Sequence, residues 1–531
     1  MDSRAESRSP AAISSRIAWT GSDGPQPDAT TSKPPSRIET RIKWTRRETE
    51  DTWVIVGCMM NTLLQKNWPW LVAAGLIVLW LLSTAVKFEP PVTDTRPIGG
   101  EEDILKLAER DDVNVLFVLV DTLRADRLGT YGYARDTSPA IDRFFSTGVR
   151  FDRHLSQSSW TKSSMASLWT SLYPTRTGVT RYEHVVADEA VMPAERLREA
   201  GFRTVGIYRN GWIAPTFGFN QGFDVYTRAP RRKMNPSVRA KNPTISDTGT
   251  DEDTVAAGIE FLRVSGHDGR FFLYMHLMDV HEYLYDEESA IFGGTQSDMY
   301  DSSIRWTDGT LDVLFAALDE FGLAENTIVV VTADHGEAFR ERGIEGHARA
   351  VYRETTEVPF LLSFPFRLEP GLVIPTRTEG VDVWPTIFDL LGLDLPDESD
   401  GTSRLPEILA AASGEPIPDS ETNAFAMLDE TWGRPPTMES RLRVAVTDGN
   451  WRYLRSPGRG KNGEAMEELF DGENDPAELR NLAEEEPERV ERLRAIADAN
   501  LEARPSWGEA PKREIGELEL NQLRALGYAI P

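Results

Sequence analysis

Four apolar runs, each followed by polar residues, constrain the fold of this chain most strongly. The runs are Asn114–Val120, Phe202–Tyr208, Phe271–Met278 and Thr327–Thr332. Each is nearly continuous in β-branched or aromatic residues, as expected of strands buried on both faces. Amphipathic stretches suited to crossover helices lie between them, at Ala190–Ala200, Thr254–Arg263 and Ile304–Phe321. This alternation predicts an α/β fold with a mainly parallel central sheet.

The last hundred residues have a different pattern. Arg441–Ser456 contains two strand-like runs around Asp448-Gly449, which is a hairpin signal. Farther on, Asp471–Arg504 is rich in Glu, Ala, Leu and Arg at helical spacing, which favours a solvated helix. We therefore expect a small antiparallel C-terminal subdomain over 436–531, after a catalytic domain over 113–435.

The N-terminal region predicts a membrane attachment. Residues 1 to about 51 are rich in Ser, Pro, Thr, Arg and Asp without a sustained apolar period, so we expect an N-terminal segment over 1–66 to be disordered. Trp68–Val86 carries no charged residue and is close to the length that crosses a bilayer. Basic residues such as Lys66 and Arg47 precede it, which favours an inside N-terminus. We expect a single-pass anchor over 67–87, a linker over 88–112 and an extracytoplasmic body, periplasmic or extracellular.

Two alternatives to the anchor stay open. Ser83-Thr84-Ala85 resembles a signal-peptide cleavage site, although the preceding segment is long for a signal peptide. If translation starts at Met59 or Met60, the apolar run follows an ordinary export leader, and the first 58 residues are not part of the protein.

Composition excludes several classes of function. The net charge of −27 would repel nucleic acid, so we expect no nucleic-acid partner. The single cysteine, Cys58, excludes an internal disulfide and every multi-cysteine metal site. Any metal must therefore bind Asp, Glu, His or hydroxyl ligands.

Polar residues at the ends of the predicted strands form a candidate site. They are Asp121, Asn210, Asp279 with His281, and Asp334 with His335. In open α/β sheets, ligands bind beyond the carboxyl ends of the strands. An Asp at a single strand end is usually a cap or a turn residue, but four polar strand ends indicate a site. Carboxylate and imidazole ligands suit Mn²⁺, Mg²⁺ or Zn²⁺.

A second polar concentration spans Gln157–Pro174, where Ser, Thr and Lys precede a helical run over Ser164–Leu172. Hydroxyl groups at a helix N-terminus are usually caps. The helix dipole and free N–H groups could also hold a phosphate or a sulfate.

These segments resemble the sulfatase branch of the alkaline phosphatase superfamily, from about Asn114 to Tyr528. The matching motifs are NVLFVLVDTLRADRLGTYGY, WTKSSMASLWTSLYPTRTGV, FFLYMHLMDVHEYLY, TIVVVTADHGEAFRERGIEGHARAVYRETTEVPFLLSFP and the tail from NWRYLRS to LRALGYAI. The resemblance implies an alkaline-phosphatase-like α/β sandwich with a small antiparallel C-terminal subdomain. It also implies a metal-dependent hydrolase of ester bonds.

The resemblance also implies roles for single residues. Asp121, Asp334 and His335 would bind one divalent metal (Mn, Zn, Mg or Ca), with Thr161 as the nucleophile coordinated to it. His281 and His347 would contact the substrate oxyanion and protonate the leaving group. In a two-metal alternative they become ligands, but the spacing of Asp279 and His281 favours one metal. Lys162 could clamp an anionic substrate, or be solvated.

The departures from the family pattern suggest a different nucleophile chemistry. Sulfatases oxidise a Cys or Ser to formylglycine within Cys/Ser-x-Pro-x-Arg, and Thr161 stands in that place. Threonine cannot form that aldehyde, and Ser163 and Met165 replace the motif's Pro and Arg. Thr122 replaces the second Asp of the usual pair. These changes resemble the phosphodiesterases and phosphoglycerol transferases that use a metal-bound threonine alkoxide.

The leading hypothesis is thus an exported, membrane-anchored metallohydrolase that cleaves or transfers a phospho-ester or related anionic ester. One alternative is a sulfuric ester hydrolase acting without formylglycine. Another is a catalytically degenerate scaffold that binds an anion. We expect Asn210 to be a turn residue. Counting along an extended strand from His281, we expect His276 to point away from the site.

Overall fold

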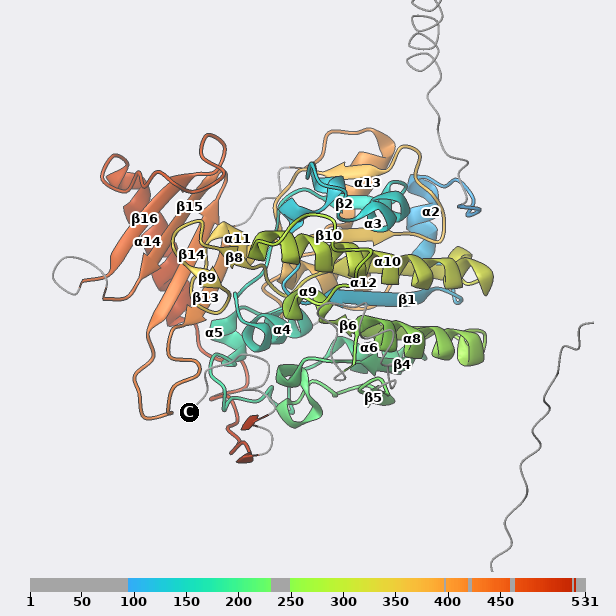
Figure 1. Cartoon of the computed structure of the whole chain (residues 1–531), viewed down its shortest axis with the longest axis horizontal. Coiled ribbons are helices and arrows are strands. Elements are labelled where there is room, and N and C mark those ends of the chain that lie inside the picture. The colour runs from blue at the N-terminus through green and yellow to red at the C-terminus, as the bar shows by residue number, and fades with distance from the viewer. Residues whose placement is uncertain are drawn as a thin grey trace, which may run out of the picture. The chain divides into compact units, whose positions relative to one another are not determined.

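An eight-stranded sheet lies at the centre of the structure, a computed structural model that describes residues 94–230, 249–395, 398–418, 423–458, 464–517 and 520–521 (Figure 1). The strand order is β11-β2-β10-β7-β1-β6-β4-β5. The strands are β1 (Asn114–Val120), β2 (Val149–Phe151), β4 (Arg203–Ile207), β5 (Val225–Thr227), β6 (Phe271–Leu277), β7 (Thr327–Thr332), β10 (Phe360–Ser363) and β11 (Leu372–Ile374). Every pairing within this sheet is parallel except the two made by β10. The predicted α/β fold with a mainly parallel sheet is therefore confirmed.

The four predicted strands form the inner part of this sheet. They correspond to β1, β4, β6 and β7, and each observed strand ends within one residue of the predicted run. All seven residues of β1 are buried, since both faces of the strand are covered. Val115, Phe117 and Leu119 belong to one apolar core, whereas Leu116 and Val118 belong to the other.

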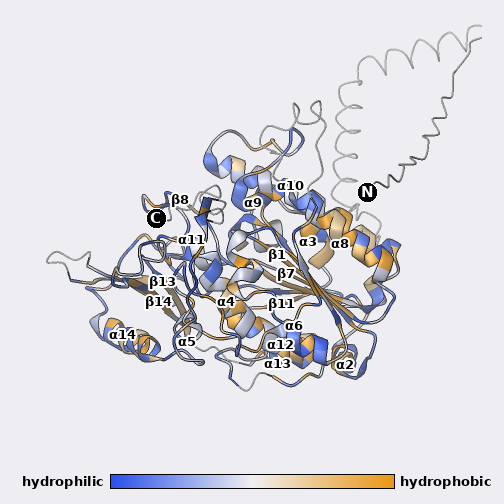
Figure 2. Cartoon of the chain, turned by 90° about the horizontal axis from the view of Figure 1, so that it is seen from below, coloured by the Kyte–Doolittle hydropathy of each residue, from blue (hydrophilic) through white to orange (hydrophobic). Residues whose placement is uncertain are grey.

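Helices cover both faces of the sheet. Those that pack on the core containing Phe117 are α4 (Thr161–Thr170), α6 (Pro193–Glu199), α12 (Val383–Leu390) and α13 (Leu405–Ser413). Those on the other core are α3 (Pro139–Phe145), α8 (Asp251–Ser265) and α10 (Gln296–Glu320). Figure 2 shows the apolar residues of the helices facing the sheet between them. The predicted crossover helices are α6, α8 and α10, the last two extended beyond the predicted bounds.

Short elements complete the part of the chain that contains the eight-stranded sheet. They are α2 (Glu101–Lys106), α5 (Pro174–Thr177), α9 (Asp279–Glu282), α11 (Arg353–Thr356) and the strand pairs β3 (His154–Leu155) with β12 (Thr378–Glu379), and β8 (Ala338–Phe339) with β9 (Glu345–Gly346). Helix α9 directly follows strand β6, so His281 lies on this helix and not on the strand.

The C-terminal region forms a second, antiparallel sheet. Its strands, in order, are β13 (Ala424–Asp429), β14 (Leu442–Asp448), β15 (Trp451–Ser456) and β16 (Met466–Asp471), packed against α14 (Pro487–Glu502). The predicted hairpin is confirmed, because Asp448 pairs with Trp451 across the turn. The first strand of this sheet precedes the expected boundary at residue 436. Hydrogen bonds from Arg452 Nη2 to Val351 O (2.7 Å) and from Arg353 Nη1 to Pro476 O (3.0 Å) join the two sheets' regions.

The expected single-pass anchor and the extracytoplasmic location that depended on it need correction. Across the described ranges, no helix combines the length and the apolar character needed to cross a bilayer. The segments expected as disordered (1–66) and as the anchor (67–87) lie outside the described residues.

Trp384 is central to the core on the α4 side of the sheet. Its ring stacks on Phe117 and Trp169, with centroid distances of 5.2 and 5.3 Å, and its side chain is fully buried. We predict that Trp384→Ala lowers the free energy of unfolding by about 3–5 kcal/mol, because truncating a buried aromatic leaves a cavity. Thermal or denaturant unfolding measures this loss. Val313→Ala, at an exposed position of α10, serves as the control and should change stability little. Equal effects of the two changes would contradict the assignment of this core.

Candidate active site

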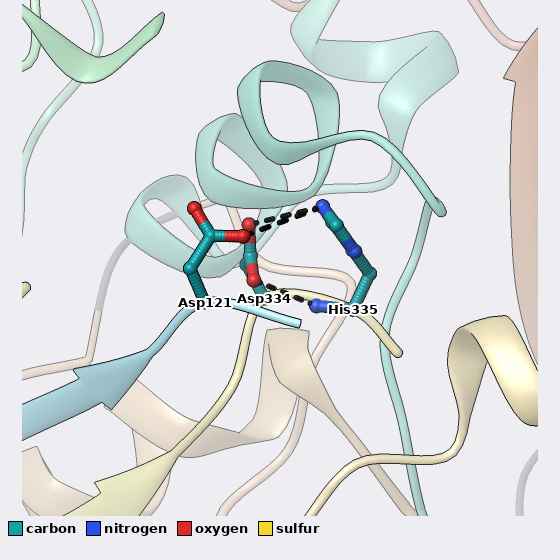
Figure 3. A group of neighbouring side chains, drawn as sticks. All are labelled: Asp121, Asp334 and His335. Carbon is teal, nitrogen blue, oxygen red and sulfur yellow. Dashed lines mark hydrogen bonds and ion pairs between the residues drawn. The ribbon is translucent and has the colours of Figure 1, made fainter. Parts of the chain in front are cut away.

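The ends of parallel strands and the start of one helix meet at a single edge of the central sheet. Asp121 directly follows β1, Asp334 and His335 follow β7, and Thr161 is the first residue of α4. All four side chains are buried. The structure therefore brings together the four residues that the sequence predicts as a metal site, and Figure 3 shows three of them side by side.

Three acceptor atoms face one another in this group. One ligand atom each from Asp121, Asp334 and His335 lies within 4.8 Å of the others. His335 Nε2 is 3.3 Å from Asp334 Oδ2 and 3.9 Å from Asp121 Oδ1. Among the described residues, neither of these two carboxylate oxygens has a hydrogen-bond donor.

The orientation of His335 adds a lone pair to the two oxygens. His335 Nδ1 lies 3.0 Å from the carbonyl oxygen of Gly336, which can only accept, so Nδ1 carries the proton. In the neutral imidazole, Nε2 then carries the lone pair, and this atom faces the carboxylates. Two anionic oxygens and one nitrogen lone pair, buried together, repel each other unless a positive charge lies between them. This donor set fits a divalent cation.

The other oxygen of each carboxylate is fixed by hydrogen bonds. Asp121 Oδ2 accepts from Asn210 Nδ2 (2.7 Å) and lies 3.2 Å from His276 Nε2. Asp334 Oδ1 accepts from the backbone N–H groups of Thr122 (3.2 Å) and His335 (2.9 Å). Thr122 adopts a φ of 64°, an uncommon backbone for a β-branched residue, and this turns its N–H toward Asp334. Such supports orient the two carboxylates and leave the oxygens that face His335 Nε2 without a donor among the described residues.

The two carboxylates have opposite pKa shifts. Burial alone would raise the pKa of Asp121, but the neighbouring His281 and His276 imidazoles hold it well below its usual range. Burial and the charge of Asp121 raise the pKa of Asp334. Two buried carboxyl groups this close cannot both ionise readily without a nearby positive charge.

Thr161 lies where its hydroxyl can serve as a nucleophile. Thr161 Oγ1 is 3.1 Å from His335 Nε2 and 3.4 Å from Asn210 Nδ2. The sequence suggested that this helix begins at Ser164, but helix α4 begins three residues earlier, at Thr161. The hydroxyl is therefore at the helix N-terminus itself, where the unpaired N–H groups and the dipole favour an anion.

His281 and His347 lie beside the metal-ligand group with different protonation tendencies. Their ring centroids are 4.9 Å apart, and His347 stacks on His335 at 4.6 Å. Burial lowers the pKa of His281 to about 4. Burial also disfavours the charged form of His347, but Glu337, whose Oε2 is 3.1 Å from His347 Nδ1, raises the pKa of His347 above its ordinary value.

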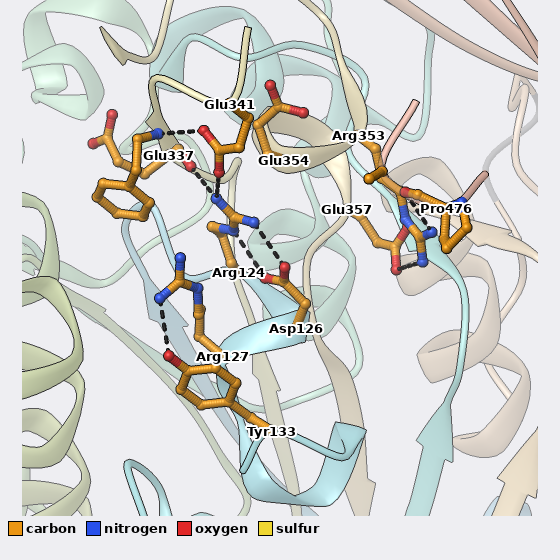
Figure 4. Close-up of polar contacts among 12 residues, drawn as sticks. Arg124, Asp126, Arg127, Tyr133, Glu337, Glu341, Arg353, Glu354, Glu357 and Pro476 are labelled. Carbon is orange, nitrogen blue, oxygen red and sulfur yellow. Dashed lines mark hydrogen bonds and ion pairs between the residues drawn. The ribbon is translucent and has the colours of Figure 1, made fainter. Parts of the chain in front are cut away.

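A network around Arg124 fixes the segment that carries Asp334, His335 and Glu337 (Figure 4). Arg124 Nη1 donates to the backbone carbonyl of Glu337 (2.8 Å) and to Glu341 Oε1 (2.6 Å). Its Nε and Nη2 bind the carboxylate of Asp126. Arg124 follows Asp121 by three residues, so the network ties the two ligand-bearing segments together.

Two other predicted site residues have structural partners. Lys162 is fully buried, so the solvated alternative is wrong. Its Nζ donates to Tyr182 O (2.7 Å) and lies 3.6 Å from the centroid of the Phe217 ring. Asp279 accepts from Trp306 Nε1 (2.7 Å) and from Asp251 N (2.9 Å), and it pairs with Arg209. Asp279 therefore supports helix α9 and is not part of the group that faces Thr161.

The expectation for His276 was wrong, whereas Asn210 is a turn residue, as expected, and also contacts the site. His276 points at Asp121, and parity counted from His281 failed because His281 belongs to α9 and not to the extended strand. The register of β6 on β1 pairs His276 with Leu119, two residues before Asp121 and on the same face, and this signal would have placed it correctly. Asn210 caps Trp212 N through Oδ1, as a turn residue does, while its Nδ2 contacts Asp121 and Thr161.

Comparison with known proteins gives the family. The family model named Sulfatase matches residues 113–393, and a model described as N-sulphoglucosamine sulphohydrolase, C-terminal, matches residues 346–502. An ulvan-active sulfatase of Formosa agariphila is 24% identical over 72% of this chain and 80% of its own. An N-acetylgalactosamine-6-O-sulfatase of Bacteroides thetaiotaomicron is 22% identical over 73% of this chain and 92% of its own.

Other similarities are shorter or structural. Arylsulfatase K of Xenopus laevis is 30% identical, but the match covers only 36% of this chain and 35% of that protein. Among solved structures, a phosphonate monoester hydrolase of Silicibacter pomeroyi has a TM-score of 0.55 at 20% identity, covering 73% of this chain and 94% of that one. A 2-O GAG sulfatase has a TM-score of 0.59 at 18% identity, covering 73% and 92%. Because the Sulfatase family model matches more than half of the chain, this protein belongs to the sulfatase family of the alkaline phosphatase superfamily.

Proposed function

We propose that this protein is a metal-dependent hydrolase of a phospho-ester or related anionic ester, with Thr161 as its nucleophile. Membership of the sulfatase family indicates a hydrolase of sulfuric or phospho-esters in general. The observation that carries the finer proposal is the position of Thr161 Oγ1, 3.1 Å from His335 Nε2 at the N-terminus of α4. A threonine hydroxyl is a weak nucleophile unless its environment activates it.

Asp121, Asp334 and His335 would hold the divalent cation. Their unpaired oxygens and the Nε2 lone pair support this assignment. A divalent cation bound there would lower the pKa of the adjacent hydroxyl and neutralise charge on the substrate. Asn210, within 3.4 Å of Thr161 Oγ1, would orient that oxygen, and the first N–H groups of α4 would receive an anionic oxygen of the substrate.

The two histidines would divide the remaining proton chemistry. Thr161 would lose its proton to solvent before the reaction, and as the bond from its Oγ1 to phosphorus forms and the ester bond breaks, the leaving oxygen would take a proton from His347. Glu337 supports this role because it stabilises the protonated imidazole. Neutral His281 would donate a hydrogen bond to a substrate oxygen. Water would then attack phosphorus and give its proton to His347 as the bond to Thr161 Oγ1 breaks, which restores the protonated imidazole and the free Thr161 oxygen.

One second function has an observation in its favour. Two relatives that align with more than 70% of this chain are named as sulfatases, which favours a sulfuric ester substrate. Thr161 and Met165 oppose this alternative, because formylglycine cannot form from threonine. A non-catalytic anion-binding scaffold has less support, since the ligand atoms of Asp121, Asp334 and His335 are buried together beside Thr161.

Removing the Thr161 hydroxyl tests the nucleophile. The full chain, reloaded with Mn²⁺, Zn²⁺, Mg²⁺ or Ca²⁺, is assayed on an aryl sulfate, a phosphate monoester, a phosphodiester and a phosphonate ester. We predict turnover of a phospho-ester and a loss of at least about 1000-fold in kcat for Thr161→Ala. Thr170→Ala, which removes a buried hydroxyl at the other end of α4, should retain activity. Turnover of sulfate alone, or an active Thr161→Ala variant, would refute the proposal.

Metal removal tests the ligand group. We expect elemental analysis to find about one divalent ion per chain in the wild type, and much less in Asp334→Asn, which loses one anionic ligand. Readdition of metal at a hundredfold excess over its Kd should raise the free energy of unfolding by about 2.7 kcal/mol in the wild type. Asp251→Asn changes a buried carboxylate outside the group and should retain the metal. Metal-free wild-type protein with unchanged stability on readdition would contradict the assignment.

The leaving-group dependence of His347→Gln tests the acid. Protonation matters only when the leaving group is a poor one, so we predict a loss of about 100-fold or more on an alkyl ester and a small loss on a 4-nitrophenyl ester. Glu337→Gln should show the same pattern more weakly, since it acts through His347. A loss that is independent of the leaving group would remove His347 from this role.

A further inference from the structure

A loop of the C-terminal subdomain contacts the candidate active site on two sides. This loop, 430–441, connects β13 to β14. The Trp432 ring stacks on Trp160 at 4.6 Å, and Trp160 immediately precedes Thr161. Trp432 Nε1 donates to the carbonyl of Ala348 (3.1 Å), the residue after His347. The loop is therefore held against the segments that carry the proposed nucleophile and the proposed acid.

The backbone of the same loop is fixed by a buried arginine of the catalytic part. Arg181 is 6% exposed, and its guanidinium donates to the carbonyls of Met438 (2.8 Å), Pro435 (3.0 Å) and Arg434 (3.3 Å). Tyr182 N also donates to Trp432 O (2.9 Å). Several charge-assisted bonds to one loop backbone hold a defined conformation, so the loop is a preorganised wall beside the site.

Two arginines near these contacts have no carboxylate partner within the described ranges. Arg434 lies two residues after Trp432, and Arg349 directly follows Ala348. Both side chains are exposed. Arg349 Nε lies 4.0 Å from the position that a Cβ on Gly346 would take, so the side chain folds back toward the residue before His347. Neither guanidinium is neutralised by an ion pair within the described ranges, so both charges are available to an anionic ligand that enters beside the loop.

We propose that Arg349 and Arg434, here called the cationic rim, bind a second negative charge on the leaving group of the substrate. This inference rests on the proposed function, which places the reacting ester between Thr161 and His347. The leaving group departs toward His347, and Arg349 and the Trp432 loop border that residue. A carboxylate or a sulfate on the leaving group would meet two guanidinium groups, which bind either anion in a bidentate manner.

The cationic rim would affect which substrate binds, and in which orientation, more than the rate of the chemical step. Exposed charges attract a ligand weakly and in a salt-dependent way, so the contribution of each arginine is modest. The acidic surface elsewhere would repel the same substrate, and this contrast favours one approach direction. The substrate class is thus an ester whose leaving group is itself anionic.

A matched pair of esters tests the rim. The esters are 4-nitrophenyl phenylphosphonate and its analogue with a carboxylate on the nitrophenyl ring, with a sulfonate analogue as a third arm. We predict a lower KM for both charged esters in the wild type. Arg349→Gln and Arg434→Gln should each raise that KM about three- to tenfold, with kcat and the uncharged ester nearly unaffected. Added salt should reduce the preference. Arg198→Gln, an exposed arginine of α6, removes the same charge elsewhere and should change nothing.

Equilibrium binding separates this inference from the proposed function. Calorimetry of both esters with the metal-loaded Thr161→Ala variant needs no turnover, and the charged ester should bind more tightly only while both arginines are present. If binding shows this preference but no phospho-ester is hydrolysed, the proposed reaction is refuted and the proposed role of the cationic rim is supported. Equal binding of the two esters, equal effects of the rim variants on both, or an equal effect of Arg198→Gln would overturn the rim.

Discussion

The mutual repulsion of three buried acceptor atoms is the constraint on which the site depends. Asp121 Oδ1, Asp334 Oδ2 and His335 Nε2 face one another without hydrogen-bond donors on the two oxygens among the described residues. Buried charges of like sign are retained only where a compensating charge stabilises them. Asn210 and His276 hold the other oxygen of Asp121, and the cation-binding proposal supplies the compensating charge.

The fold orients each proposed ligand through hydrogen bonds to the atom that does not face the other two ligands. Parallel strands β1 and β7 deliver the two carboxylates to one edge, and the hydrogen bonds of Asn210, His276 and Thr122 hold the outer oxygens. Helix α4 then presents Thr161 with its N-terminus toward the same point. Arg124 ties the β1 and β7 segments together, and the Trp432 loop closes the side formed by the C-terminal subdomain.

Much of this arrangement could be predicted from sequence because it depends on strand ends. Buried strands are visible as apolar runs, and the residues after them must meet at one edge if the strands are parallel. His276 could not be placed in this way, since its role depends on the register of β6 and on where that strand becomes helix α9. The burial of Lys162 depends on Tyr182 and Phe217, which are distant in sequence from the nucleophile segment. Tertiary contacts of this kind leave no local pattern.

Trapping the covalent intermediate tests the central claim most directly. The metal-loaded full chain is mixed with a phospho-ester that it turns over, quenched in acid within the first turnovers, digested and examined by mass spectrometry. The account predicts a phosphoryl or phosphonyl group on Thr161, in an amount that rises with substrate and disappears as substrate is consumed. Turnover with an unmodified Thr161 peptide at every time, or with the group on another residue, would contradict a threonine nucleophile.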